Sequence, residues 1–230
     1  MKIKSSKRYK KLLESSKADK LVNLEDAIKK IKKNCTAKFD ESIDISLNLN
    51  LKKKKEEITL RTVVNLPNGN GKKLKIAVLC EESKIKEAKD SGADLTGSDN
   101  LVNDIANGKI NFDKLVATPS MMSKMGKLGK ILGPKGLMPN PKLGTVTNNL
   151  NQTIKALKTG QIEIKNDKDG NIGASIGKNS FPDTKIIENY NAFMQTIEKE
   201  KPIGIKGNFV MSTFLTSTMG VSYKLKLKTQ

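Results

Sequence analysis

A short run near the carboxyl terminus carries the side chains best suited to uncharged hydrogen bonding. Residues 216–220 read Thr-Ser-Thr-Met-Gly. Hydroxyl groups and a bare glycine backbone can meet ribose 2′-hydroxyls and phosphates, so this run is a candidate surface for RNA. The alternative is the polar edge of a β-hairpin, and composition alone favours neither. Near the other end of the chain, Phe39 follows Lys38 and could stack on a base.

A second candidate for phosphate binding is the lysine- and glycine-rich segment 124–146. No Asp or Glu occurs from residue 114 to residue 162, where the charged residues are Lys114, Lys124, Lys127, Lys130, Lys135, Lys142, Lys155 and Lys158. The segment is not a nucleotide-binding P-loop, because Ile131 follows Gly129-Lys130 where the motif needs Ser or Thr. It is either an ordinary Gly/Pro connection or a basic loop that binds phosphates, and the absence of acidic residues favours the loop.

Other kinds of chemistry find little support in the residue types. The chain has no histidine and only two cysteines, which lack the close spacing of zinc ligands. The carboxylate pairs Asp40–Glu41 and Asp167–Asp169 are expected to be solvated surface groups, because neighbours on a strand point to opposite faces and the second pair lies in a turn. We find no nucleophile with a base, and we therefore predict no enzymatic activity, no catalytic residue, no metal and no cofactor.

The charge balance indicates a polyanionic partner. The 230-residue chain has 43 Lys and Arg against 24 Asp and Glu, a net charge of +19. A surface this cationic favours nucleic acid. Only Arg8 and Arg61 are arginines, so most of the charge consists of point charges on phosphates and predicts strong salt dependence. A genome rich in lysine codons would give the same excess.

No segment of the sequence predicts insertion into a membrane. No apolar run approaches the roughly 18 residues of a membrane span, and the N-terminus lacks the apolar stretch of a secretory signal. A basic amphipathic N-terminus could instead bind a membrane surface or serve as a transit segment, but Glu14 and Asp19 follow at once. We expect a soluble intracellular protein whose Cys35 and Cys80 are free thiols rather than a disulfide.

The N-terminal candidates must be positioned by a helix and strands. Apolar residues at helical spacing predict an amphipathic helix over 24–33. Strict alternation over 42–51 predicts a half-buried strand. Residues 58–64 are expected to pair with this strand as a hairpin whose tip is the charged run 52–57.

A different pattern follows the Pro/Gly cluster at 66–73, which predicts a domain boundary. Continuous apolar runs predict buried strands at 74–80 and 115–119, and helices are expected at 84–92 and 101–108. Strands alternating with helices predict a three-layer α/β unit with a largely parallel sheet. A last helix starts at Asn148 or Asn149 and ends at Gly160.

After Gly160 the first pattern returns. Strands are expected on both sides of an Asp169-Gly170 turn, followed by an amphipathic helix at 181–201 and two strands at 207–217 and 221–228. Residues 1–67 alone have too few layers to cover a sheet. We therefore predict a two-layer α+β domain made from both chain termini, 1–67 and 159–230, with an inserted three-layer α/β (Rossmann-like) domain at 68–158. Its two connections, at 66–72 and 157–161, are expected to form a hinge.

Five motifs occur in order along nearly the whole chain: AKFDESIDI, LVATPSMM, KLGKILGPKGLMPNPKLGTVT, FPDTK and STMG. Together they closely resemble the large-subunit ribosomal protein L-one family in its bacterial form, and GPKGLMPNPK is highly specific. The resemblance implies a protein that binds a helical junction of large-subunit rRNA at the mobile side stalk and helps to release deacylated tRNA from the exit site. Members also bind their own operon mRNA and repress its translation. The alternative is a general RNA-binding protein that acts only as an mRNA repressor or RNA chaperone.

The resemblance also implies which residues read the RNA. The main rRNA-binding surface belongs to the domain built from both chain ends, and its residues are Lys38, Phe39, Ser42, Ser212, Thr216, Ser217, Thr218, Met219 and Gly220. The inserted domain carries a secondary basic loop with Lys127, Lys130, Lys135 and Lys142. The implied partners are large-subunit rRNA, exit-site tRNA and the operon mRNA, with no membrane, and the chain is expected to be a monomer outside the ribosome. Its expected location is the cytoplasmic ribosome, with an organelle matrix as the alternative.

Overall fold

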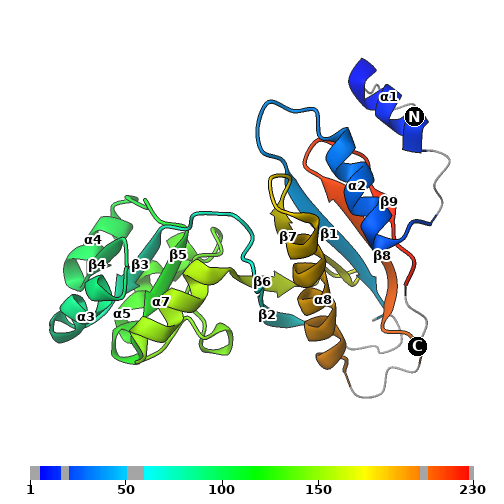
Figure 1. The fold of residues 1–230 in the computed structure, drawn as a ribbon. Coiled ribbons are helices and arrows are strands. Elements are labelled where there is room, and N and C mark those ends of the chain that lie inside the picture. Colours follow the sequence, from blue (N-terminus) through cyan, green and yellow to red (C-terminus); the bar gives the residue numbers. More distant parts are fainter. Residues whose placement is uncertain (1–5, 17–20, 51–59, 203–206, 228–230) are drawn as a thin grey trace. The chain divides into compact units, whose positions relative to one another are not determined.

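The computed structural model of the chain describes residues 6–16, 21–50, 60–202 and 207–227. The chain divides into two compact units of mixed helices and sheets (Figure 1). Unit 1 combines residues 1–71 with residues 162–230, and unit 2 comprises residues 72–161. The first unit is thus assembled from both ends of the chain.

A four-stranded antiparallel sheet in the order β7-β1-β8-β9 forms the centre of unit 1. Its strands are β1 (Ser42–Leu49), β7 (Asn171–Lys178), β8 (Val210–Ser217) and β9 (Tyr223–Lys224). The alternation predicted for β1 is confirmed, because every second side chain is buried: Ile43, Ile45, Leu47 and Leu49. Pairing with both β7 and β8 makes β1 a central strand.

The predicted hairpin between residues 42–51 and 58–64 is wrong. Strand β2 (Arg61–Asn65) pairs with β6 (Gln161–Lys165) in a separate two-stranded sheet. It cannot join β1, because β7 and β8 already occupy both edges of that strand. The charged tip predicted at 52–57 lies outside the described residues. The turn before Gly170 does form, with that glycine at φ 81°, but the strands on its two sides belong to different sheets.

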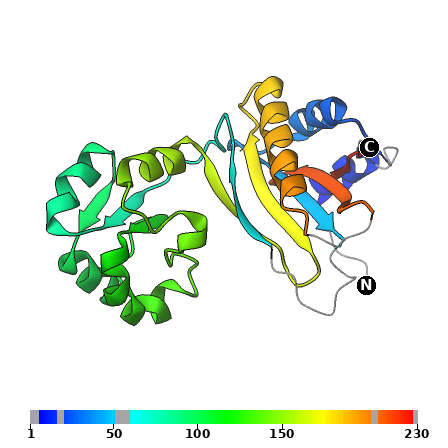
Figure 2. The same ribbon diagram turned by 90° about the horizontal axis from the view of Figure 1, so that it is seen from below.

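Two helices cover one face of the four-stranded sheet (Figure 2). They are α2 (Leu24–Asn34) and α8 (Asp183–Lys199), close to the predicted ranges. Their apolar faces join the inward side chains of the sheet in one core, to which the helices contribute Ala27, Ile28, Ile31, Ile186, Phe193 and Ile197. Each fully buried large apolar side chain stabilises the fold by about 1.5 to 3 kcal/mol relative to its exposure. A further helix, α1 (Lys7–Ser16), precedes α2.

Unit 2 is built on a parallel sheet in the order β4-β3-β5. Its strands are β3 (Ile76–Leu79), β4 (Leu95–Gly97) and β5 (Lys114–Ala117). The alternate side chains of β3 enter two separate apolar clusters, Ala77 and Leu79 on one face and Ile76 and Val78 on the other. Helices therefore cover both faces of this sheet. The two predicted strands are confirmed, whereas β4 is too short and too exposed to leave a clear pattern in the sequence.

The helices of unit 2 divide between these two faces. Those that pack beside Ala77 and Leu79 are α4 (Asp99–Ala106), α5 (Met122–Met125) and α6 (Gly129–Leu132), while α3 (Ile85–Asp90) and α7 (Leu150–Thr159) lie on the other face. Four short 3₁₀ turns connect the elements of this unit: η1 (Glu82–Lys84), η2 (Pro119–Met121), η3 (Gly126–Leu128) and η4 (Pro141–Leu143). Gly160 ends α7 in the left-handed conformation (φ 119°), as its residue type predicts.

Both cysteines are free thiols, as expected; Cys80 is buried and Cys35 is half-buried. None of the helices in the described part of the chain has the length and apolarity needed to cross a membrane.

Candidate RNA-binding surface

Antiparallel pairing brings two distant parts of the sequence together in unit 1. Because the start of β1 lies beside the end of β8, Ile43 is opposite Ser217. The backbone N–H of Thr218 donates to the carbonyl of Ser42 at 3.1 Å, and the Ser42 N–H donates to the Thr218 hydroxyl at 2.9 Å. The loop before β1 and the turn after β8 therefore form one surface, which we name the loop–turn surface and define as residues 37–42 and 217–220.

Glu41 connects the two parts of the loop–turn surface from its buried side. Its side chain is buried, with a relative exposure of 1% for the residue. One carboxylate oxygen accepts from the Ala37 N–H at 3.2 Å, and the other accepts from the Met219 N–H at 3.1 Å. The expectation that Asp40 and Glu41 are both solvated is therefore wrong for Glu41. The alternation of β1 continues back to this residue, so it points to the same side of the sheet as Ile43.

The surroundings of Glu41 keep its carboxylate ionised. Burial by itself opposes ionisation and raises the pKa, but the hydrogen bonds from the Met219 and Ala37 N–H groups, together with the nearby Ser217 side chain, outweigh it. The positive charge of Arg8 acts in the same direction, and the pKa of Glu41 is lowered from its ordinary value. A buried carboxylate that is satisfied in this way fixes the geometry of both backbone segments that donate to it.

Ser217 supports the surface from its buried side. It is among the residues implied to bind RNA, but its side chain is buried (3% exposed) and adjoins the Glu41 carboxylate. Gly220 packs directly on it, since a Cβ at residue 220 would lie 2.3 Å from the Ser217 Oγ. Only glycine permits this close approach without displacing the hydroxyl.

This packing predicts that Gly220→Ala destabilises the protein by about 1 to 3 kcal/mol, the usual cost of overpacking. The new methyl group must displace the Ser217 Oγ, the end of a short buried side chain that lies beside the Glu41 carboxylate. Gly173→Ala is the matched control, because a Cβ there meets no atom within 4 Å. Urea denaturation of both variants measures the difference. Equal stability of the two variants would contradict the packing described for the turn.

Arg8 ties helix α1 to the same turn. Its guanidinium donates to the Thr36 hydroxyl at 2.9 Å and to the Met219 carbonyl at 2.7 Å. The turn is thus held on both sides, by Glu41 at a backbone N–H and by Arg8 at a carbonyl. The only signal for this residue in the sequence is its type, since Arg8 is one of two arginines among 43 basic residues.

The outer side of the loop–turn surface exposes two large apolar side chains. Phe39 is 54% exposed and Met219 is 48% exposed. Lys38 and Thr218 beside them are also exposed. An aromatic ring and a thioether next to a lysine and a hydroxyl suit an unstacked base and its backbone better than they suit water.

The face of the four-stranded sheet opposite α2 and α8 extends this surface along β1 and β8. Cross-strand partners on that face are Asp44 with Thr216, Ser46 with Phe214 and Asn48 with Ser212. Ser212 precedes Thr218 by six residues of extended chain, about 20 Å at 3.3 Å per residue. Ser212 and Thr216 thus lie on the same, largely polar face of the sheet, but Ser212 is far from the turn.

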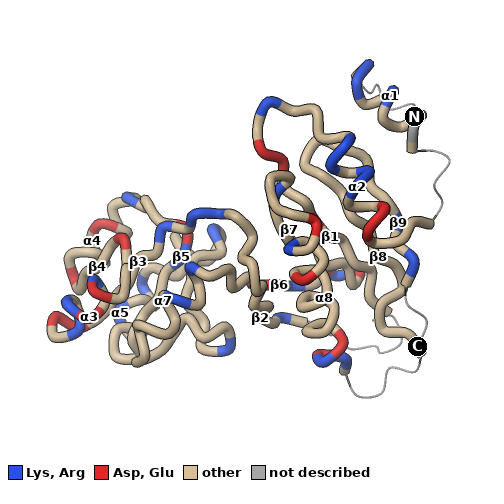
Figure 3. Tube along the Cα trace, in the orientation of Figure 1, with Lys and Arg blue, Asp and Glu red and all other residues tan. Residues whose placement is uncertain are grey.

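The basic loop residues all lie in unit 2. Met125, Leu128 and Leu132 are buried against the parallel sheet, which leaves the intervening lysines outside. The four predicted side chains are exposed: Lys127, Lys130, Lys135 and Lys142. Figure 3 shows that basic positions also occur throughout unit 1, so positive charge alone does not single out either unit.

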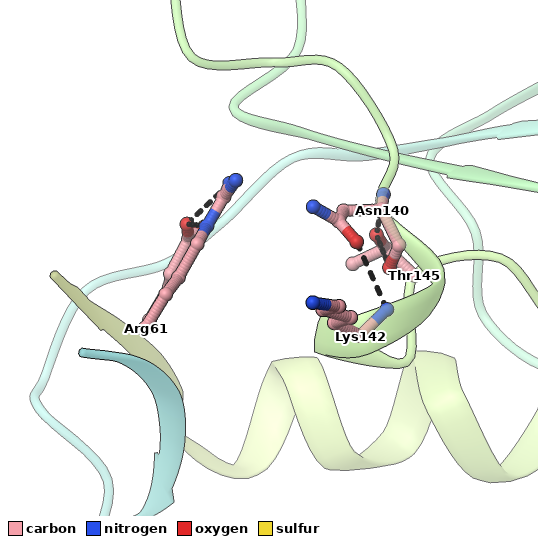
Figure 4. A network of polar contacts seen from close by, with 5 residues as sticks. Arg61, Asn140, Lys142 and Thr145 are labelled. Carbon is pink, nitrogen blue, oxygen red and sulfur yellow. Dashed lines mark hydrogen bonds and ion pairs between the residues drawn. The ribbon is translucent and has the colours of Figure 1, made fainter. Parts of the chain in front are cut away.

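The last of these lysines stands in a tightly bonded turn (Figure 4). The Asn140 side chain accepts from the Lys142 N–H at 2.9 Å, and the Thr145 hydroxyl accepts from the Asn140 N–H at 2.8 Å. Gly144 closes the turn in the left-handed region at φ 69°. Figure 4 also shows the ion pair of Arg61 with Glu163, at 2.7 Å, on the β2–β6 ribbon of unit 1.

Exposed lysines without a fitted site act on RNA as point charges. We therefore expect Lys135→Ala to lower RNA affinity to the same degree for all sequences and to reduce the slope of log affinity against log salt by about one unit. Lys29→Ala is the control, since Lys29 is an exposed lysine of α2, on the helix-covered side of the sheet. Affinities measured across a salt series test this expectation, and a loss confined to one RNA sequence would contradict it.

The described residues contain no group of three or more His, Cys, Asp or Glu side chains that could hold a metal ion.

Comparison with known proteins gives a consistent result over nearly the whole chain. The model of the "Ribosomal protein L1p/L10e family" matches residues 10–221. The "Large ribosomal subunit protein uL1" of Pelagibacter ubique (strain HTCC1062) is 56% identical over 223 residues, which cover 96% of this chain and 97% of the relative. The protein of the same name from Rickettsia prowazekii (strain Madrid E) is 45% identical over 227 residues, which cover 99% of this chain and 95% of the relative.

Proposed function

Because the chain belongs to the ribosomal protein L1p/L10e family, we propose that it binds large-subunit rRNA at the mobile side stalk through the loop–turn surface. The chain is a protein of the large ribosomal subunit, and its relatives are ribosomal proteins rather than enzymes. In the proposed complex, Phe39 and Met219 contact bases, Lys38 contacts phosphate, and Thr218 and Gly220 contact the sugar–phosphate backbone.

The observation that carries this proposal is that the buried Glu41 carboxylate joins the two segments that expose Phe39 and Met219. The Glu41 carboxylate joins the loop at Ala37 to the turn at Met219. It holds the surface in one shape before RNA arrives, so little conformational entropy is lost on binding. Thr and Gly at the turn add few rotamers to immobilise. Recognition by a fixed shape suits a junction in folded RNA.

The finer roles belong to the same proposal. Release of deacylated tRNA from the exit site requires the bound protein to move with the stalk, and a hinge at 66–72 and 157–161 would allow unit 2 to do so. The two-layer domain of both chain termini would carry the rRNA contact, while the inserted domain would add phosphate contacts from its basic loop. Repression of the operon mRNA would use the loop–turn surface on a junction of similar shape. The free protein is proposed to be a monomer.

Three RNAs of equal length test the proposal: the stalk junction of the large-subunit rRNA, the leader of the chain's own operon mRNA, and an unrelated duplex. Fluorescence anisotropy at two salt concentrations gives the affinity of each. We expect the two junction RNAs to bind orders of magnitude more tightly than the duplex and to keep most of this advantage at high salt. Equal binding of all three, falling steeply with salt, would mean that only lysine charge is at work and would overturn the proposal.

A further inference from the structure

Lys178, the last residue of β7, reaches the loop–turn surface from the neighbouring strand. It lies opposite Ser42 in the pairing of β7 with β1. Its ammonium group donates to the Ser42 hydroxyl at 2.9 Å and contacts the Asp40 carbonyl at 3.4 Å. Ser42 is also the residue whose backbone is bonded to Thr218. The ammonium of Lys178 thus orders the loop side of the surface.

The stem of the same lysine packs on the chain segment that leaves unit 1. A Cβ at Gly71 would lie 2.7 Å from the Lys178 Cγ and 3.3 Å from the Phe181 ring, so the bare glycine backbone sits directly on both side chains. Gly71 adopts φ +75°, a conformation that further favours glycine. It is the last residue of the first segment of unit 1. The Lys178 ammonium group therefore contacts the loop–turn surface, while the methylene groups of the same side chain contact Gly71, where the chain leaves unit 1.

The residues before Gly71 are bonded firmly to unit 1. Asn189 is fully buried, and its side chain accepts from the Asn68 N–H at 3.1 Å and donates to the Gly69 carbonyl at 2.8 Å. The Asn68 side chain donates to Glu188 at 2.6 Å. We call residues 66–71 the connector. Asn70 is buried as well. Gly71, the last residue of the connector, rests on Lys178 and Phe181, so a movement of Lys178 would reach the connector at this residue.

We propose that Lys178 orders the loop–turn surface in the free protein, contacts an RNA phosphate in the complex, and thereby couples RNA binding to the end of the connector at Gly71. This inference rests on the proposed function. An RNA phosphate competes with the Ser42 hydroxyl for the ammonium group, because a charge-assisted bond to phosphate is the stronger one. When the ammonium group moves to the phosphate, the methylene groups of Lys178 move away from Gly71, and the end of the connector becomes less tightly packed. By linkage, a loosened connector favours RNA binding to the same degree.

Two methionine variants test the role of this lysine. Lys178→Met keeps an unbranched stem on Gly71 but removes the ammonium, and Lys224→Met removes an exposed lysine from β9, at the opposite edge of the sheet. For each protein, free and bound to junction RNA, we would measure the affinity and the amide hydrogen exchange of residues 66–75. We expect RNA to speed this exchange several-fold in the natural protein and in Lys224→Met. In Lys178→Met, affinity should fall about tenfold or more, and the exchange should no longer respond to saturating RNA.

Several outcomes would overturn the coupling. One is an RNA-independent exchange of residues 66–75 in the natural protein, and another is a normal exchange response in Lys178→Met. A third is the same loss of affinity in Lys224→Met as in Lys178→Met. Lys178→Arg, which restores a cation on the stem, should recover part of the affinity if the head group is responsible. Failure of the natural protein to prefer the junction over a duplex is a different result, because it rejects the proposed function itself.

Discussion

Replacing Glu41 with glutamine is expected to lower the free energy of unfolding by about 1 to 3 kcal/mol and to weaken junction binding about tenfold or more. The carboxylate accepts from two backbone N–H groups, at Ala37 and Met219. A glutamine amide has only one oxygen, so its NH₂ group must face one of these donors in a buried site. The loop and the turn then lose their common anchor, and the RNA surface loses its fixed shape.

The pH dependence of this effect follows from the lowered pKa of Glu41. A carboxylate whose folded pKa lies below its unfolded value stabilises the protein fully above the unfolded pKa, 4.5 for a glutamate, and loses this contribution as the pH falls through the folded pKa. The stability difference between the natural protein and Glu41→Gln should therefore be largest near neutral pH. It should shrink as the pH falls below 4.5 and through the lower pKa of the folded state.

Urea denaturation at neutral and acidic pH measures both effects, with Glu25→Gln as the control. Glu25 is an exposed glutamate of α2, so its replacement should leave stability and junction affinity nearly unchanged. If Glu41→Gln behaves like Glu25→Gln, the carboxylate is not the anchor of the loop–turn surface. A penalty that stays constant from neutral to acidic pH would contradict its ionised state.

Thr218→Val should weaken binding of the junction RNA by about 1 to 3 kcal/mol while leaving binding to an unrelated duplex unchanged. Valine keeps the shape of threonine but leaves a polar group of the RNA without its partner. The sequence alone predicts little change in stability for this variant. The structure adds a cost, because the Thr218 hydroxyl accepts from the Ser42 N–H, and we expect a loss of about 1 kcal/mol.

Thr147→Val separates the two effects of Thr218→Val. The Thr147 hydroxyl also accepts from a backbone N–H, that of Asn149 at 3.0 Å, but it lies in unit 2. Its replacement should cost similar stability and leave junction affinity intact. If both valine variants bind the junction as tightly as the natural protein, the turn does not read RNA.

Local patterns in the sequence predicted most of the elements that build the surface. The alternation over 42–51 is sufficient to predict β1, and apolar spacing predicts α2 and α8. The partners of β1 could not be read in this way, since they depend on which distant strands reach its two edges. Local adjacency favoured residues 58–64, whereas β7 and β8 lie more than a hundred residues further along the chain.

In the candidate site too, local patterns predict some residues, whereas others depend on contacts between distant parts of the chain. Lys38, Phe39, Thr218 and Met219 were found through motifs, and each is exposed on the loop–turn surface. The motifs assign no role to Glu41, although extending the alternation of β1 by two residues places it on the buried side. Arg8 and Lys178 act through contacts with Met219 and Ser42, 211 and 136 positions away. No pattern in neighbouring residues records such contacts.

The most direct test of the RNA-reading surface is hydroxyl-radical footprinting of the protein with and without junction RNA. Phe39, Met219 and Met211 are all exposed large apolar side chains, at 54%, 48% and 57%. Met211 lies in β8 seven residues before Thr218, where the pairing with β1 shifts its register, so it is far along the strand from the loop–turn surface and serves as the internal reference. We predict that junction RNA slows oxidation of Phe39 and Met219 several-fold and leaves Met211 unchanged. Unchanged oxidation of Phe39 and Met219 in the bound protein would contradict the assignment of the loop–turn surface.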